Sequence, residues 1–231
     1  MSEFKRIGVL GGMGPQATIL LQQRLVSGIA ADDDASHVPL LIDMNPQIPS
    51  RLDWILKKQG DDPGPVLAGM ARTLEHAGAS ALAMPCNTAH YYAPQITAAV
   101  SIPLLNMIEL SGQAILRSIG DDAVVGMLAS PATQQINLFK NAFASHGLRV
   151  VHPDRTEQLL SAIRRIKSQG ASRLDTETLL DAAQDCERQG ATCLLVGCSE
   201  FSLIADTLSG CLPVFDSLDV LVEQMLLFAA S

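Results

Sequence analysis

Two of the five cysteines in this 231-residue chain stand where an apolar run gives way to polar residues. Cys86 lies in MPCNTAH and Cys198 in VGCSEFS. A thiol between a strand and the first turn of a helix meets exposed backbone N–H groups and the positive end of the helix dipole, which lower its pKa. Such thiols exchange protons readily. We therefore predict that Cys86 and Cys198 are functional thiols, not ordinary core residues.

The other cysteines differ, because none has a turn of polar residues beside it. For Cys186, Cys193 and Cys211 the simpler interpretation is a small core hydrophobe. An odd number of cysteines at irregular spacing also favours reduced thiols over a disulfide framework. His90 follows Cys86 by four residues, but a Cys/His dyad lacks an obvious orienting partner, and zinc would need four suitably spaced ligands.

Short apolar runs alternate with segments of helical spacing along the chain. Strands are expected at 5–13, 38–44, 79–86, 102–108, 123–129, 148–153, 191–198 and 212–217, and a first helix at 14–30, with Pro15 near its start. Alternation of this kind predicts βαβ units and a mostly parallel sheet.

The two halves of the chain echo each other. RIGVLGGMGPQAT resembles AVVGMLASPATQQ, and ALAMPCNTAH resembles LLVGCSEFSL. This repetition predicts two similar Rossmann-like, doubly wound domains related by a pseudo-two-fold axis: residues 1–100 plus 212–231 with Cys86, and residues 101–211 with Cys198. Ligands gather at the carboxyl ends of strands in open α/β sheets. We expect both thiols to face one cleft between the domains.

Several polar groups could hold a ligand there. The glycines of GGMG fail the dinucleotide fingerprint, yet Gly12, Met13 and Gly14 could bring backbone N–H groups to a carboxylate, or form only a tight turn. Arg51 ends a proline-stiffened loop and could pair with a carboxylate, or be solvated. The remaining candidates are Asn87, Thr88, Ser199 and Glu200 beside the thiols, which could equally be helix caps, and Lys167, which could belong to a basic helix face.

Composition narrows the classes of partner. A net charge of −8 and no Lys/Arg stripe argue against nucleic acid. Apolar stretches are too short to span a bilayer, and the N-terminus has no signal-peptide pattern, so a cytoplasmic protein without a membrane role is expected.

Four motifs together resemble the aspartate/glutamate racemase family: GGMGP (11–15), NPQIPSR (45–51), PCNTAH (85–90) and GCSE (197–200). The resemblance is nearest to the aspartate racemase branch. It implies racemisation without pyridoxal phosphate, metal or any other cofactor, a dicarboxylic amino acid as the small-molecule partner, and a homodimer.

Carried over by motif, the resemblance makes Cys86 and Cys198 the two catalytic cysteines. Gly12, Met13 and Gly14 match a loop of the cleft floor, Asn87, Thr88 and Ser199 match polar residues around the amino acid, and Arg51 and Lys167 match cations on the side-chain carboxylate. Two departures stand out, GCSE for GCTE and PSR for PDR; Ser199 keeps the hydroxyl, whereas the missing acid at Ser50 affects substrate preference.

More than one function fits these motifs. A glutamate-specific racemase, a hydantoin racemase or a cis-trans isomerase of unsaturated diacids could also use paired cysteines. A protein that binds a dicarboxylate without turnover would need neither thiol.

Overall fold

The computed structural model describes residues 4–210 and 212–231, which form two compact units. Unit 1 comprises Met1–Met107 and Leu218–Ser231, and unit 2 comprises Ile108–Ser217. The chain thus leaves unit 1 after Met107 and returns to it after Ser217. Each unit has its own sheet and its own core.

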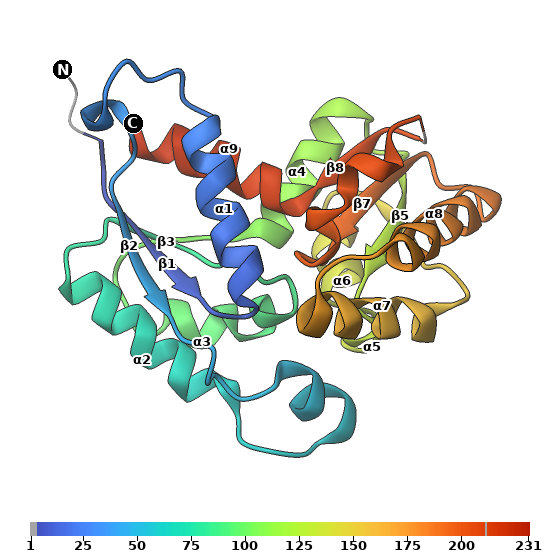
Figure 1. Cartoon of the computed structure of the whole chain (residues 1–231), viewed down its shortest axis with the longest axis horizontal. Helices are drawn as coiled ribbons and strands as arrows, with labels where there is room; N and C mark the ends of the chain where they lie inside the picture. The colour runs from blue at the N-terminus through green and yellow to red at the C-terminus, as the bar shows by residue number, and fades with distance from the viewer. Residues whose placement is uncertain (1–3, 211) are drawn as a thin grey trace. The chain divides into compact units, whose positions relative to one another are not determined.

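The elements of unit 1 surround a four-stranded sheet (Figure 1). Its strands are β1 (Ile7–Gly11), β2 (Leu40–Met44), β3 (Ala81–Ala83) and β4 (Leu104–Leu105). Its helices are α1 (Pro15–Ser27), α2 (Pro63–His76), α3 (Ala93–Thr97) and, from its second residue, α9 (Ser217–Ala229), with shorter helical turns η1 (Asp34–Ser36), η2 (Asp53–Lys57) and η3 (Thr88–Tyr92).

Unit 2 has the same kind of sheet. Its strands are β5 (Val124–Ala129), β6 (Arg149–Val151), β7 (Cys193–Gly197) and β8 (Val214–Asp216). Its helices are α4 (Met107–Ser118, from its second residue), α5 (Pro131–Gln135), α6 (Leu138–Ala144), α7 (Thr156–Gln169) and α8 (Arg173–Arg188), with the turns η4 (Phe201–Leu203) and η5 (Ala205–Leu208).

All pairings in both sheets are parallel, and the strand orders match: β2-β1-β3-β4 in unit 1 and β6-β5-β7-β8 in unit 2. Parallel neighbours need crossover connections, which the intervening helices supply. The predicted α/β class with two similar, parallel-sheet domains is confirmed. The apolar repetition between the two halves therefore reflects two copies of one topology.

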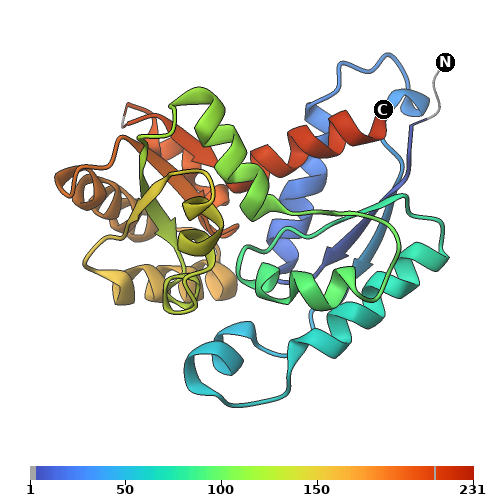
Figure 2. The same cartoon turned by 180° about the vertical axis from the view of Figure 1, so that it is seen from behind.

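Helices pack on the sheets, which explains why the central strands are continuous apolar runs. Every residue of β1, β5 and β7 is buried, as expected where no face meets water. In unit 1, α1 and α9 lie on one face of the sheet, and α2 and α3 lie on the other (Figures 1 and 2). In unit 2, α7 and α8 share one buried cluster with β7.

The strand pairing differs in detail from the boundaries expected from sequence. Leu104–Leu105 pairs with β3 in the first sheet, whereas the sequence-based division placed it in the second domain. Val214–Asp216 pairs with β7 in the second sheet, whereas the division placed it in the first. Each sheet thus takes its fourth strand from just before the chain leaves the unit. Apolar content marks a strand but does not say which neighbour it pairs with.

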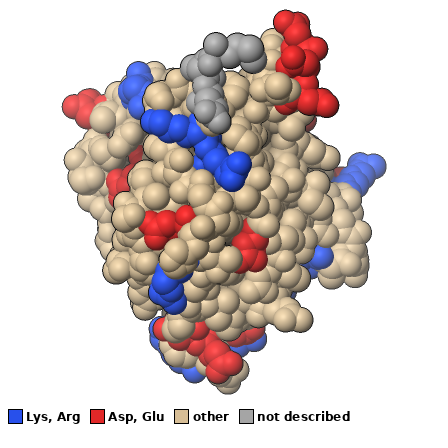
Figure 3. All heavy atoms as spheres, turned by 90° about the vertical axis from the view of Figure 1, so that its left-hand side faces the viewer, with Lys and Arg blue, Asp and Glu red and all other residues tan. Residues whose placement is uncertain are grey.

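On the face drawn in Figure 3, most of the surface is uncharged, and both basic and acidic side chains lie on it. Among residues 4–210 and 212–231, no helix is long and apolar enough to cross a membrane.

Candidate active site

Three of the predicted motifs follow neighbouring strands of unit 1. Gly12–Gly14 follow β1, the segment 45–51 follows β2, and Cys86 follows β3. Because these strands are parallel and adjacent, their carboxyl ends share one edge of the sheet. Met13, Ile48 and Cys86, one from each motif, belong to a single buried cluster. The structure therefore brings the three N-terminal motifs together.

The glycine loop is held by a close approach of two backbones. Gly12 has a φ of 95°, and a Cβ on it would lie 2.3 Å from the carbonyl oxygen of Asn45. Asn45 also donates its N–H to the carbonyl of Gly11 (3.3 Å). Position 12 therefore needs glycine both for its conformation and for the missing side chain.

Gly12, Met13 and Gly14, which were predicted to bind a ligand, make contacts within the protein itself. The N–H of Gly12 donates to Thr18 Oγ1 at 3.0 Å, so it is already occupied. The side chain of Met13 is buried in the apolar cluster. Gly14 precedes α1, and its carbonyl accepts from the N–H of Thr18. The loop is thus held in place by its hydrogen bonds with Thr18 and by the buried side chain of Met13.

Cys86 sits in a tightly hydrogen-bonded turn. Its side chain is 8% exposed, and its carbonyl accepts the N–H of Ala89 (3.2 Å) and faces His90 Nδ1 (2.9 Å). Asn87 and Thr88 are also buried. The residues after the cysteine form η3 and the five-residue helix α3, instead of one long helix. The structure therefore gives the thiol a buried, well-fixed position.

Arg51 begins a helical turn that Ser50 caps. The Oγ of Ser50 accepts the N–H of Asp53 (3.1 Å), and its carbonyl accepts that of Trp54 (3.0 Å). Ser and Asp are both favoured at such caps, so Ser50 fits this local role. The Nη1 of Arg51 donates to the carbonyl of Pro49 (3.1 Å). Its Nε is buried without a hydrogen-bond partner among the described residues.

Tyr92 was not singled out by the sequence. Its hydroxyl is buried and, within residues 4–210 and 212–231, has no hydrogen-bond partner. Burial and then Asp62 raise the pKa of this phenol, and the positive charge of Arg51 opposes that rise. Arg51 is therefore its electrostatic neighbour. The only sequence signal was its position two residues beyond the CNTAH motif.

In unit 2 the second thiol belongs to a chain of three side chains. Cys198 Sγ donates to Glu200 Oε2 at 3.1 Å, and Lys167 Nζ lies 3.3 Å from Glu200 Oε1. Lys167 comes from α7, far away in sequence, yet it meets the cysteine loop, which a purely solvated basic face would not do. Ser199, which stands between Cys198 and Glu200 in the sequence, is also buried.

This arrangement overturns the expected pKa of Cys198. The sequence predicted a lowered value, from a helix N-terminus. Burial raises the pKa of Cys198 well above its ordinary range, the carboxylate of Glu200 raises it further, and Lys167 partly opposes the rise. The helical segment after the thiol is the three-residue turn η4, whose dipole is short, so desolvation prevails.

Two of the remaining cysteines are core residues. Burial raises the pKa of Cys186 to about 12 and that of Cys193 to about 11. Both are completely buried, and both thiols are free of disulfides. Cys211 lies outside the described residues.

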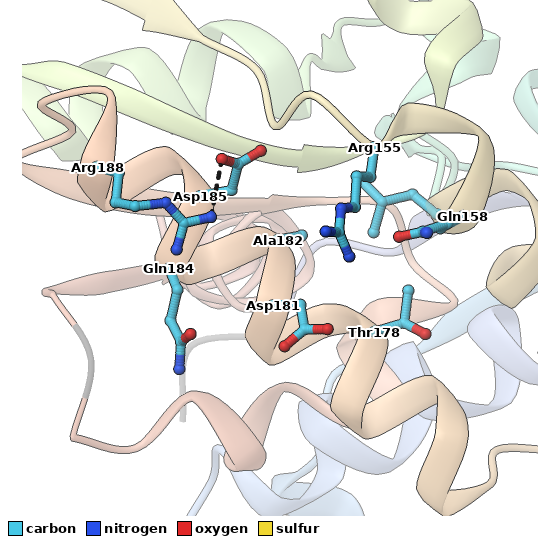
Figure 4. A pocket seen from close by; sticks show the side chains of 9 residues that line it. Arg155, Gln158, Thr178, Asp181, Ala182, Gln184, Asp185 and Arg188 are labelled. Carbon is cyan, nitrogen blue, oxygen red and sulfur yellow. Dashed lines mark hydrogen bonds and ion pairs between the residues drawn. The ribbon is translucent and has the colours of Figure 1, made fainter.

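A pocket of about 210 Å³ lies between α7 and α8 of unit 2. Figure 4 shows Arg155 and Gln158 from the start of α7 facing Asp181 and Thr178 of α8. Arg188 and Asp185 form an ion pair at 3.1 Å on its wall. None of the predicted site residues lines this pocket.

The family described as Asp/Glu/Hydantoin racemase matches residues 10–225. The chain belongs to this family. It is therefore an enzyme of the amino-acid racemase class, whose members are isomerases.

Proteins of known structure or activity that are similar to this chain agree with the assignment. The chain is 25% identical over 218 residues to the broad specificity amino-acid racemase RacX of Bacillus subtilis (strain 168), covering 91% of this chain and 92% of the relative. The aspartate racemase of Picrophilus torridus superposes with a TM-score of 0.86 at 26% identity, over 97% of this chain and 94% of that one.

A glutamate racemase of Francisella tularensis, solved in complex with D-glutamate, superposes with a TM-score of 0.67 at 16% identity, over 96% of this chain and 80% of that one. At that identity the likeness concerns the fold alone. The racemase fold is thus common to relatives named for different amino acids.

Proposed function

We propose that this racemase interconverts the enantiomers of an acidic amino acid, aspartate or glutamate, without a cofactor, through Cys86 and Cys198. The observation that carries the proposal is the equivalence of the two thiols. Each is buried and free, and each follows the third strand in the order of a four-stranded parallel sheet. A reaction that exchanges protons on both faces of Cα needs two acid/base groups, and a cysteine stands at the same place in each of the two sheets.

Racemisation removes a proton from one face of Cα and returns a proton to the other. One cysteine, as thiolate, takes the Cα proton and becomes a thiol. The other, as thiol, gives its proton to the opposite face and becomes a thiolate. Proton number is conserved, and the reverse reaction exchanges the two roles.

The state of Cys198 assigns its starting role. With its pKa raised and its Sγ–H bonded to Glu200, Cys198 rests as a thiol. It is therefore the proton donor in the first turnover, and Cys86 is the base for the enantiomer that starts it. The carboxylate of Glu200 holds this proton in the resting state, the Sγ–H turns from Glu200 toward Cα when it is donated, and Lys167 limits the negative charge beside it.

Cations supply the specificity for an acidic substrate in this proposal. Arg51 has a buried Nε without a partner among the described residues, and a guanidinium binds a carboxylate through two parallel hydrogen bonds. Lys167, which the resemblance assigns to the same carboxylate, is paired with Glu200 in the resting protein and would have to share its charge with the substrate. Developing negative charge at the substrate carboxylate is stabilised by such groups.

A broader substrate range is the second candidate. The relative RacX is named for broad specificity, and Ser50 puts a neutral cap where the resemblance expects an acid. Hydantoin racemisation, diacid isomerisation and dicarboxylate binding without turnover are the competing hypotheses. A homodimer in the cytoplasm completes the proposal, and light scattering of the purified protein measures its oligomeric state.

The test is solvent deuterium incorporation at Cα, followed by proton NMR, with purified protein and no added cofactor. L-aspartate and L-glutamate are examined first, then a panel of neutral and basic amino acids. Exchange together with formation of the D-enantiomer supports the racemase and names its substrate. Exchange only with neutral or basic amino acids rejects the acidic substrate, and no exchange with any amino acid rejects the function.

Variants test the mechanism separately. Cys86→Ser and Cys198→Ser should each abolish formation of the opposite enantiomer. Cys186→Ala is the matched control, because it removes a buried thiol of unit 2 outside the motifs. Turnover like that of the wild type in either serine variant would reject the two-thiol mechanism.

A further inference from the structure

Two buried side chains occupy equivalent positions that the proposed chemistry leaves unused. His90 follows Cys86 by four residues, and Ser202 follows Cys198 by four. Both are 3% exposed. Each makes a hydrogen bond near the end of the fourth strand of its own sheet. His90 bonds to Met107, just after β4, and Ser202 bonds to Asp216, the last residue of β8.

In unit 1, His90 joins the cysteine loop to Met107, the last residue before the chain leaves the unit. Its Nε2 accepts the backbone N–H of Met107 at 3.2 Å, so the proton of the neutral ring is on Nδ1. Nδ1 then donates to the carbonyl of Cys86 at 2.9 Å. The chain enters unit 2 directly after Met107. One imidazole therefore fixes the thiol-bearing residue relative to the point where the chain leaves.

In unit 2, Ser202 makes the corresponding link with its hydroxyl on one side and its own backbone N–H on the other. Its Oγ donates to Oδ1 of Asp216 at 2.7 Å, and its own N–H approaches the carbonyl of Cys198 at 3.3 Å. Asp216 ends β8, and the chain returns to unit 1 after Ser217. Ser217 Oγ in turn donates to the carbonyl of Val196 in β7, two residues before Cys198.

The imidazole is suited to this role because it stays neutral. Burial lowers the pKa of His90 to about 4, so at neutral pH the ring has one donor and one acceptor nitrogen. A charged ring would have two donors and could not accept from Met107. His90 is thus unsuited to be a general base and well suited to hold two backbone groups at once.

We infer that His90 and Ser202 are a matched pair of positioning residues. Each fixes one cysteine loop to the segment at which the chain leaves that unit, and each thereby controls proton transfer at its own thiol. The inference rests on the proposed two-thiol racemisation. Neither residue touches the substrate in this scheme. Each acts through the cysteine four residues before it.

Two substitutions divide the role of His90. His90→Gln keeps an acceptor near the Nε2 position, and His90→Asn keeps a donor near the Nδ1 position, whereas His90→Leu removes both. Ser202→Ala removes the bond to Asp216, and Ser202→Thr keeps the hydroxyl. The matched controls are His76→Gln and Ser168→Ala, which alter exposed residues of the same types.

The decisive readout is the primary isotope effect with Cα-deuterated L and D substrate. Because the equilibrium constant between enantiomers is one, kcat/KM falls equally in both directions and cannot say which thiol is impaired. The isotope effect can, because it grows for the enantiomer whose proton the impaired thiol removes. His90→Leu should raise it for one enantiomer and Ser202→Ala for the other. We expect kcat to fall about tenfold in Ser202→Ala, which loses one hydrogen bond, and further in His90→Leu, which loses two, with KM little changed in both.

An equal change for both enantiomers, or the same asymmetry in both variants, would overturn the inference. Two measurements do not need activity. Amide hydrogen exchange at Met107 should accelerate in His90→Leu and stay slow in His90→Gln, and alkylation of Cys86 should change in His90→Leu while that of Cys198 does not. If the wild type racemises nothing, the proposed function fails, and these two readouts still decide whether His90 positions Cys86.

Discussion

The Sγ of Cys198 lies 3.1 Å from Oε2 of Glu200, and this short hydrogen bond places a negative charge beside a buried thiol. The thiol keeps its proton because the carboxylate accepts it and because water cannot solvate a thiolate there. Lys167 lies 3.3 Å from the other carboxylate oxygen, and its positive charge partly offsets the effect of Glu200 on the thiol. Burial is thus the main reason that Cys198 keeps its proton, and Glu200 and Lys167 shift its pKa in opposite directions.

Opposite changes should follow from neutralising the two partners of this thiol. Glu200→Gln removes the negative charge and should lower the pKa of Cys198, whereas Lys167→Met removes the positive charge and should raise it. The pH dependence of Cys198 alkylation, resolved by peptide mass spectrometry, measures both. Shifts of the same sign in the two variants would contradict the opposite effects assigned to these two charges.

Arg51 should govern affinity more than rate. Arg51→Ala should raise KM for the acidic substrate at least about tenfold, since a bidentate carboxylate contact is lost, and Arg51→Lys should restore only part of it. Arg72→Ala, an exposed arginine of α2, is the control. An unchanged KM in Arg51→Ala would remove this residue from the site.

Tyr92→Phe tests whether the buried hydroxyl of Tyr92 forms a hydrogen bond with the substrate. The hydroxyl has no partner in the described residues, so its removal should leave stability unchanged or increase it by about 1 kcal/mol. If the substrate supplies the missing partner, KM rises in the same variant. Urea unfolding and steady-state kinetics on one preparation measure both; a large loss of stability would mean that the hydroxyl is bonded in the resting protein.

His90 should make the protein sensitive to acid. Its pKa is about 4 in the folded chain against an ordinary 6.5, so between these values the unfolded chain binds more protons. Stability is then fully present above pH 6.5 and falls as the pH drops toward 4, with a loss of about 2 kcal/mol at pH 5. His90→Gln lacks this dependence. Urea midpoints of both proteins at pH 7.5 and 5 should converge at the lower pH, and parallel losses would contradict the assignment.

Gly12→Ala should be costly for two reasons that a control can separate. Gly12 and Gly60 both have positive φ, at 95° and 85°, but a Cβ meets the Asn45 backbone only at position 12 and meets nothing within 4 Å at position 60. We expect about 1 kcal/mol of destabilisation for Gly60→Ala and at least about 2 kcal/mol for Gly12→Ala. Thermal unfolding compares them. Equal losses would mean that the Asn45 contact relaxes without cost.

Much of the fold could be predicted because its signals are local. β1, β5 and β7 are buried on both faces, so each is an uninterrupted apolar run, and Pro15 marks the start of α1 through its fixed φ. The repeated order of these local signals also predicted two similar units. The positions of Cys86 and Cys198 after equivalent strands followed from the same repetition.

Pairing and electrostatics depended on tertiary structure. Leu104–Leu105 joins β3, and Val214–Asp216 joins β7, through hydrogen bonds that no local pattern encodes. The polar residues after Cys198 suggested a helix dipole and a lowered pKa, whereas folding buries the thiol against Glu200 and raises it. Sequence by itself determined which residue types stand at the strand ends, because propensity and burial act on neighbours in the chain. Only the tertiary structure decided their charge states and partners, because solvation and Coulomb forces act between groups that the fold brings together.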